Sequence, residues 1–238
     1  MSADGKMKTF QIAIDGPVAA GKSTAAKRVA EKLGFLYVDT GAMYRAVALK
    51  AMQECVQWAD EAGVIEVVGS IELELDKPND HEKDGRLVTV VLNGKDVSAE
   101  IRTTLIGEGA SVVSAYAGVR EVLVAMQQNI AEGENVVMEG RDIGTRVLPK
   151  ANLKIYMDAS VEERVNRKWK FQKKLGIKES REEVREAMMK RDRREMTRKV
   201  DPLKLAVGGW RFDTTGLSEK QVVEKIVERV RKLMANSI

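Results

Sequence analysis

The sequence predicts an α/β fold in which helices flank a parallel sheet, and three observations lead to this expectation. Short apolar runs of strand length alternate with stretches of helical periodicity. A glycine-rich loop separates the first apolar run from the first helical stretch. The last helical stretch has an apolar stripe along one face, as a helix packed on a sheet requires. Strands that alternate with helices indicate a parallel sheet, because parallel strands need a long crossover connection.

The expected strands are short and apolar, and each leads into a polar turn and a helix. Gly34 is expected to stop the first helix, and Asp39 or Thr40 to cap the second. Ser218 and Gln221 have the spacing of a capping box before the last helix. In chain order, strands are expected at 10–15, 35–38, 136–138, 153–157 and 210–213, and helices at 23–33, 43–55 and from 218 onward, with Val222, Val223, Ile226, Val230 and Leu233 on one face.

Two regions break this alternation. In the first, residues 64–97, strand-like segments at 71–75 and 87–92 are expected to belong to a small sheet, in which Asn93-Gly94 makes a tight hairpin turn. A polar stretch at 76–86 is expected to be an exposed loop, and His81, the only histidine, is expected to be solvated there. Residues 161–204 have a helical pattern and are rich in arginine and lysine.

Composition excludes several classes of protein. The chain has 238 residues, 44% of them hydrophobic, which is enough for a sizeable core. Its 40 Lys and Arg against 36 Asp and Glu give a net charge of only +4, a weak signal for nucleic acid. Cys55 is the single cysteine, and no apolar run approaches the about 20 residues of a membrane span. With no signal-peptide pattern, a cytoplasmic enzyme is expected.

The loop after the first strand matches the G-x-x-x-x-G-K-[ST] pattern of phosphate-binding loops. Small residues let the backbone N–H groups and the helix N-terminus approach phosphate oxygens closely. Lys22 is expected on the β and γ phosphates of a nucleotide, and the Ser23 hydroxyl on Mg²⁺. The expected nucleotide-binding residues are Gly16, Pro17, Val18, Ala19, Ala20, Gly21, Lys22, Ser23 and Thr24.

Further candidate residues follow the strand ends. Arg45 has the geometry for a bidentate phosphate contact, although an arginine on an amphipathic helix is as often solvated. Residues 139–145 form a glycine-bracketed turn at the carboxyl edge of the sheet, where ligands bind in open α/β folds. Asp15 and Glu139 are carboxylates that could orient Mg²⁺ through water. Three arginines, Arg191, Arg194 and Arg198, have the spacing of one helix face that presents three guanidinium groups to a polyphosphate.

The sequence resembles the bacterial cytidylate kinases along its whole length. The motifs that carry the resemblance are residues 14–17, 39–45, 96–102, 119–121 and 140–145 and the arginine-rich segment from Arg191. The resemblance implies a P-loop nucleoside monophosphate kinase fold with a five-stranded parallel sheet. It implies one kinase domain at 1–238, with a core at about 1–40, 133–175 and 205–238, a monophosphate-binding lobe with a small antiparallel sheet at about 41–132, and a helical lid at about 176–204.

The resemblance also implies ATP and CMP or dCMP as partners, with Mg²⁺ as cofactor. A monomer that binds neither nucleic acid nor a membrane is expected. The residues implied for CMP are Arg45, Arg141 and Arg198 at its phosphate, Thr40, Arg191 and Glu195 near its ribose, and Ser111, Arg120 and Asp142 at its base, with Tyr44 as a further contact. The residues implied for catalysis are Lys22, Arg141, Arg191 and Arg194. The family usually has Asp where this chain has Glu195, which leaves the choice between CMP and dCMP open.

Other activities remain open from the residues alone. A kinase on the same fold that acts on UMP, AMP or shikimate would share the phosphate loop. A regulatory GTPase or a nucleic-acid-dependent ATPase would share it too, but the sequence has no Asn-Lys-x-Asp-like guanine motif. A nucleic-acid binder would use the basic segment and would bind with steep salt dependence.

Overall fold

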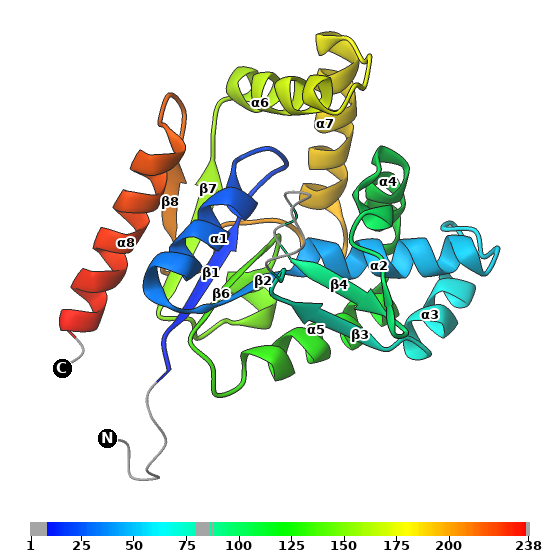
Figure 1. Ribbon diagram of the computed structural model, residues 1–238, viewed down its shortest axis with the longest axis horizontal. Coiled ribbons are helices and arrows are strands. Elements are labelled where there is room, and N and C mark those ends of the chain that lie inside the picture. The colour runs from blue at the N-terminus through cyan, green and yellow to red at the C-terminus, as the bar shows by residue number, and fades with distance from the viewer. Residues whose placement is uncertain (1–8, 80–85, 87, 237–238) are drawn as a thin grey trace. The chain divides into compact units, whose positions relative to one another are not determined.

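The computed structural model describes residues 9–79, 86 and 88–236. His81 lies outside the described residues. The chain divides into two compact units (Figure 1). The first contains Met1–Tyr37, Ile130–Thr197 and Asp201–Ile238, and the second contains Val38–Asn129 and Arg198–Val200.

A five-stranded sheet forms the centre of the first unit. Its strand order is β2-β6-β1-β7-β8, and β1 lies parallel to both β6 and β7, as β7 does to β8. The expected five-stranded parallel sheet is therefore confirmed. The bounds of its strands are β1 Gln11–Asp15, β2 Leu36–Asp39, β6 Val136–Gly140, β7 Leu153–Asp158 and β8 Trp210–Asp213.

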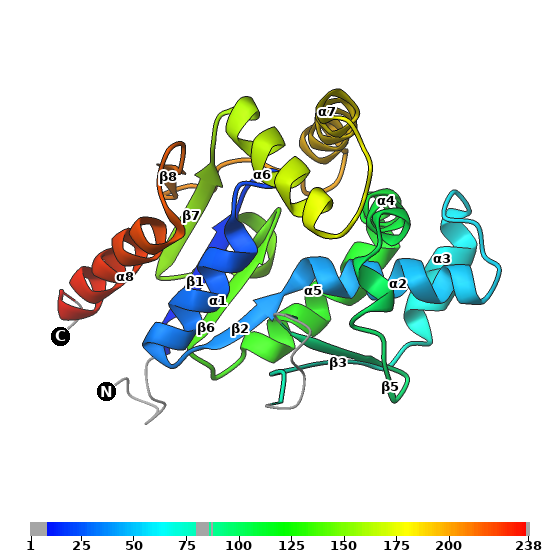
Figure 2. The same cartoon turned by 45° about the horizontal axis from the view of Figure 1, so that its top comes forward.

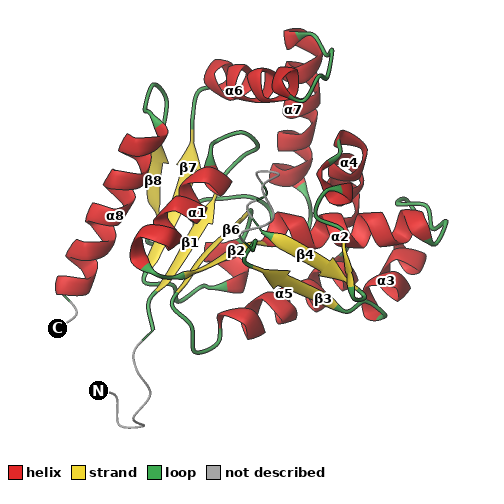
Figure 3. Cartoon of the chain, in the orientation of Figure 1, coloured by secondary structure: helices red, strands yellow, loops and turns green. Residues whose placement is uncertain are grey.

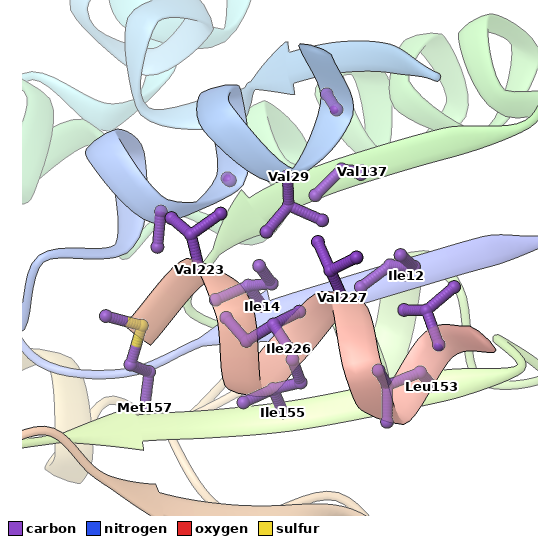
Figure 4. Packing of buried hydrophobic residues seen from close by; sticks show 14 of the residues in the cluster. Ile12, Ile14, Val29, Val137, Leu153, Ile155, Met157, Val223, Ile226 and Val227 are labelled. Atoms are coloured by element: carbon purple, nitrogen blue, oxygen red, sulfur yellow. The ribbon is translucent and has the colours of Figure 1, made fainter. Parts of the chain in front are cut away.

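Helices α1 (Lys22–Leu33) and α8 (Glu219–Ala235) pack on one face of this sheet. Figure 4 shows Val29 of α1 and Val223 of α8 directed toward the side chains of β1, β6 and β7. Ile12 and Ile14 at the centre are fully buried. Each such buried aliphatic side chain stabilises the fold by about 1.5–3 kcal/mol, so this apolar layer fixes the strand ends on which the site depends.

The helix signals in the sequence are confirmed at their predicted places. Gly34 ends α1 with φ 70°, in the left-handed region that favours glycine. Asp39 caps α2 (Thr40–Gln53), because its carboxylate accepts a hydrogen bond from the Ala42 N–H at 3.1 Å. Ser218 and Gln221 form a complete capping box at the start of α8.

Helix α2 belongs to the second unit, together with a small antiparallel sheet of order β3-β4-β5 (Figures 2 and 3). Asn93 and Gly94 both have positive φ, so the predicted hairpin turn is confirmed. The sequence predicts strands at 71–75 and 87–92, and the structure has β3 and β4 at Leu73–Asp76 and Thr89–Leu92. Residues 64–69 before them belong to a helix that was not predicted. Asp60 caps that helix by accepting from the Gly63 N–H. The remaining elements are α3 Glu61–Gly69, β3 Leu73–Asp76, β4 Thr89–Leu92, β5 Lys95–Asp96, the 3₁₀ turn η1 Glu100–Arg102, α4 Thr104–Val113 and α5 Ala117–Ala131.

The basic region of the sequence forms two helices of the first unit, α6 (Val161–Lys174) and α7 (Arg181–Thr197). Val165 of α6 packs on Val184 and Met188 of α7 in a small buried cluster. Figure 1 shows α6 and α7 next to each other. Within the described part of the chain, no single helix has the length and apolar composition to cross a membrane; α4 and α5 pass that test only as a pair bent by 102°.

Candidate active site

The phosphate loop lies between β1 and α1, and its two glycines are conformational requirements. Gly16 has φ 153°, and a Cβ there would lie 1.9 Å from the carbonyl oxygen of Met157 on β7. Gly21 has φ 92° and forms the N-cap of α1. A side chain at either position would push the loop away from the sheet or strain its backbone, so glycine keeps the amide groups of the loop close to the helix N-terminus.

Lys22 is the charged group of this loop. Its side chain is buried, and its Nζ donates a hydrogen bond to the carbonyl oxygen of Pro17 at 2.8 Å. Burial, together with the positive charge of Arg141, lowers the pKa of Lys22 from 10.5 to about 7. The amine is therefore poised to gain a proton when anionic phosphates approach it.

The turn after β6 is attached to β1 by Asp15. The two carboxylate oxygens of Asp15 accept hydrogen bonds from the N–H groups of Ile143 and Gly144, both at 2.8 Å. Burial raises the pKa of Asp15 to about 7 although these N–H groups oppose the shift. Both carboxylate oxygens of Asp15 thus hold the segment after β6. In this segment the buried Asp142 is followed by a single π-helical turn, η2 (Ile143–Val147). The expected Mg²⁺-orienting role of Asp15 is not the one its contacts favour.

Glu195 on α7 connects two arginines that the sequence analysis singled out. Its side chain is 4% exposed and accepts from Arg141 Nε at 2.5 Å and from Arg191 Nε at 2.8 Å. Burial alone would raise the pKa of Glu195, but the two arginines outweigh it and lower the pKa to about 2. Arg141 and Arg191 are therefore held side by side by one ionised carboxylate.

The expectation that Arg191, Arg194 and Arg198 share one helix face is wrong for Arg198. Helix α7 ends at Thr197, so Arg198 lies just beyond it. The chain then turns, with Asp201 at φ 45° and Pro202 after it, a residue that cannot continue a helix. The Leu203 N–H donates to the carbonyl oxygen of Glu195 at 2.9 Å and closes this turn.

Arg198 belongs to the second unit, where it meets another candidate residue. Arg198 and Arg120 both donate to the carbonyl oxygen of Ser114, at 3.3 and 3.2 Å. Ser114 is the C-cap of α4, the negative end of that helix, which attracts cations. The Arg120 guanidinium also lies 5.7 Å from the centre of the Tyr44 ring. Two guanidinium groups are thus gathered at the end of one helix.

Arg45 and Ser111 are the other prominent candidates of the second unit. Arg45 donates to the carbonyl oxygens of Ile101 and Thr103, at 2.9 and 3.4 Å, so α2 and the turn before α4 fix its guanidinium. Ser111 lies on α4 with 3% of its surface exposed, so it is not a helix-surface hydroxyl. Its Oγ has no hydrogen-bond partner among the described residues. Buried hydroxyls are nearly always paired, which makes this one a candidate ligand contact.

The two units therefore hold separate groups of the candidate residues. The first unit contains Gly16, Pro17, Val18, Ala19, Ala20, Gly21, Lys22, Ser23, Thr24, Arg141, Asp142, Arg191, Arg194 and Glu195. The second unit contains Thr40, Tyr44, Arg45, Ser111, Arg120 and Arg198.

Sequence reasoning missed the side chains that contact the phosphate loop from outside. Arg164 and Asp192 bind the backbone of Val18, and Arg167 and Thr214 bind the carbonyl oxygen of Ala20. The only signal in the sequence was the spacing of two arginines three residues apart in a basic run, a pattern that surface helices also show.

The residues present are compatible with Mg²⁺ that arrives with a nucleotide. Among the described residues, no three His, Cys, Asp or Glu side chains form a group that could hold a metal ion. Mg²⁺ commonly takes one protein oxygen, phosphate oxygens and water, and Ser23 in the first turn of α1 offers such an oxygen beside Lys22.

A parallel sheet whose first strand leads through this loop into a helix, with the partly buried Arg141 and Arg191 on neighbouring elements, defines a P-loop nucleotide-binding protein. The sequence model of the cytidylate kinase family matches residues 12–232. The chain therefore belongs to the cytidylate kinase family, and the resemblance and the fold class inferred from the sequence are confirmed.

Individual relatives agree with this assignment. The cytidylate kinase of Caldanaerobacter subterraneus subsp. tengcongensis is 47% identical over 94% of this chain and 96% of its own length. That of Bacillus subtilis is 44% identical over 94% and 98%, and that of Lysinibacillus sphaericus 46% over 95% and 99%. Among solved structures, the shikimate kinase of Bacteroides thetaiotaomicron covers 96% of this chain and 99% of its own, with 14% identity and a TM-score of 0.48, a likeness too low to bear on the activity.

Proposed function

We propose that the chain transfers the γ-phosphoryl group of Mg-ATP to CMP or dCMP, giving ADP and CDP or dCDP. One observation carries this proposal further than family membership: the buried Ser111 hydroxyl, without a partner among the described residues, lies three residues before Ser114, whose carbonyl oxygen gathers Arg120 and Arg198. A hydroxyl and two guanidinium groups near one helix end suit a ligand with a polar base and a phosphate.

The donor nucleotide belongs to the phosphate loop. Residues 16–24 would surround the β and γ phosphates with backbone N–H groups, and Lys22 would exchange its contact with Pro17 for a phosphate oxygen. Ser23 would hold Mg²⁺, which supplies charge neutralisation between the phosphates when bound.

For the acceptor, we infer the contacts that the resemblance to cytidylate kinases implies. Arg45, Arg141 and Arg198 would bind its phosphate, because planar guanidinium groups match phosphate oxygens in pairs. Thr40, Arg191 and Glu195 would lie at the ribose, and Tyr44 would be a further contact of the nucleotide. For the base, Ser111 and Asp142 would accept from the cytosine amino group and Arg120 would donate to its ring nitrogen or carbonyl oxygen.

Catalysis in this proposal consists of positioning and charge neutralisation. The phosphate of CMP is ionised at neutral pH, so its oxygen can attack the γ-phosphorus without a general base. Arg194, with Lys22, Arg141 and Arg191, would stabilise the charge that spreads over the transferring group. We infer that the lobe at about 41–132 and the lid at about 176–204 close around the substrates and exclude water. The single cysteine, Cys55, is free and exposed, which suits a monomer in a reducing cytoplasm.

An acceptor screen tests the proposal. ADP release from ATP is measured with CMP, dCMP, UMP, AMP and shikimate as acceptors, each at several concentrations. CMP or dCMP should give by far the highest kcat/KM. A preference for UMP, AMP or shikimate would assign another acceptor, and ADP release that does not depend on an acceptor would contradict phosphotransfer altogether.

A further inference from the structure

The phosphate loop is fixed at Val18 by a buried ion pair that joins α6 and α7. Arg164 of α6 donates from Nη1 to Asp192 Oδ2 of α7 at 2.5 Å. The other oxygen of Asp192 accepts from the Val18 N–H at 3.3 Å, and Arg164 Nη1 also donates to the Val18 carbonyl oxygen at 3.2 Å. Both polar groups of the Val18 residue are thus held by one ion pair. The Arg164 and Asp192 side chains are only 6% and 5% exposed.

Apolar contacts hold the same part of the loop. The side chains of Val18 and Ala19 pack against the buried cluster that Val165 forms with Val184 and Met188. This cluster lies between α6 and α7, so the loop contacts the two helices through both its backbone and its side chains.

The backbone of the loop needs such support. Ala19 has φ 59°, in the left-handed region that non-glycine residues rarely adopt. On its other side, the carbonyl oxygen of Ala20 accepts from Arg167 Nη1 and from the Thr214 hydroxyl, both at 3.3 Å. Arg164 and Arg167 are one helical turn apart and bind carbonyl oxygens that flank Ala19. The contacts therefore use the carbonyl groups on either side of the strained residue.

We propose that Asp192 is a positioning residue that couples α7 to the phosphate loop through Arg164. Asp192 is adjacent to Arg191 and two residues before Arg194, so one helix turn carries both the loop contact and the arginines assigned to phosphoryl transfer. The coupling keeps the loop in its phosphate-binding shape and keeps α7 in register with it. The proposal rests on the proposed function for its kinetic readout, but binding of an ATP analogue tests it without any acceptor.

Asp192→Asn is the first variant, because it keeps the size of the side chain and removes the charge that Arg164 needs. We expect kcat/KM for ATP to fall on the order of 10²-fold, because a misplacement of catalytic groups by about 1 Å can have an effect of this size. The KM for CMP should change little. The affinity for a non-hydrolysable ATP analogue, measured by calorimetry in the presence of Mg²⁺, should fall as well. The control is Glu162→Gln, which breaks the exposed ion pairs of α6 with Arg181 and Arg185 of α7 and touches no residue of the loop.

The double variant Arg164→Met with Asp192→Leu separates positioning from stability. Replacing a buried ion pair by apolar side chains often leaves stability unchanged, whereas removing one partner destabilises the fold. We expect the double variant to recover the thermal stability that Asp192→Asn loses, but not kcat/KM for ATP or affinity for the analogue. It also remains measurable if Asp192→Asn does not fold.

Three results would overturn the proposal. The first is a kcat/KM for ATP in Asp192→Asn that equals the wild-type value. The second is a double variant that recovers both the stability and the kcat/KM for ATP. The third is a loss of kcat/KM for ATP in Glu162→Gln as large as that in Asp192→Asn. If the wild-type enzyme fails to phosphorylate CMP or dCMP, the proposed function is wrong, and the order of analogue affinities still decides whether Asp192 positions the loop.

Discussion

Glu195 and Arg141 form a buried ion pair of 2.5 Å between α7 and the turn after β6. The same carboxylate binds Arg191, so one negative charge separates two positive ones. Without it, two guanidinium groups would face each other in a site largely removed from water. The pair therefore contributes to stability before any substrate binds. The lowered pKa of the Glu195 carboxyl group makes this contribution testable by a change of pH.

Glu195→Gln should lower the free energy of unfolding at pH 7 by about 3 kcal/mol, because it leaves buried cations uncompensated. The pKa of Glu195 is about 2 in the fold and 4.5 when unperturbed. Its contribution is present above pH 4.5 and is lost as the pH falls from 4.5 toward 2. Urea denaturation at pH 7 and pH 3 should thus show a difference that shrinks at low pH. Glu228→Gln, which removes an exposed pair with Lys232, should leave stability nearly unchanged.

Lys22→Met should abolish turnover and leave the fold intact, because it removes the charge that faces the phosphates without altering the apolar core. Steady-state kinetics and circular dichroism measure the two effects. Turnover within a few-fold of wild type would contradict the assignment of the loop.

Binding of Mg-ATP should also take up a proton at pH 8. The lowered pKa of Lys22, about 7 in the free protein, leaves the amine largely neutral there, and phosphate charge raises that pKa. Calorimetry in buffers of different ionisation enthalpy measures the uptake. The uptake should vanish at pH 5.5, where Lys22 is already protonated, and in Lys22→Met.

Arg45→Ala should weaken the use of CMP far more than that of ATP. Losing a paired phosphate contact costs about 1.5 to 3 kcal/mol, which is roughly ten- to 150-fold in kcat/KM for CMP. Lys50→Ala, on the same helix α2 and paired with Glu54, is the matched control and should leave both substrates unaffected. A loss of ATP affinity in Arg45→Ala would mean that the donor and acceptor sites are wrongly assigned.

Ser111→Ala and Asp142→Asn should reduce the ratio of kcat/KM for CMP to that for UMP. Cytosine presents an amino donor beside a ring acceptor, and uracil presents the reverse polarity, so a site of acceptors facing the amino group rejects uracil. The ratio should fall mainly through loss of CMP activity. Each lost contact should raise the activation free energy for CMP by about 1 to 3 kcal/mol. An unchanged ratio in both variants would show that the base is recognised elsewhere.

Local chemistry made the core and the loop predictable from sequence. The left-handed conformations of Gly21 and Gly34 and the capping box at Ser218 each depend on neighbours a few residues away. Such signals survive in a single sequence because the turn or cap itself requires the residue type.

Helix α4 was not predicted, because its sequence contains two glycines that lower helix propensity. Their reason is tertiary. A Cβ at Gly109 would lie 2.4 Å from Trp58, and one at Gly107 would lie 3.1 Å from the Arg45 guanidinium. The contact of Asp192 with Arg164 and Val18 was equally hidden, since its partners are 28 and 174 residues away in the chain.

The strand order β2-β6-β1-β7-β8 also determines when the sheet can form during synthesis. The first two strands made, β1 and β2, are not neighbours, and the partners of β1 begin at Val136 and Leu153. No pair of the parallel sheet can therefore exist on the ribosome until β6 has emerged. Residues 38–129 of the second unit are complete by then, so nascent chains should acquire their protease-resistant structure in that unit first and in the nucleotide-binding core last.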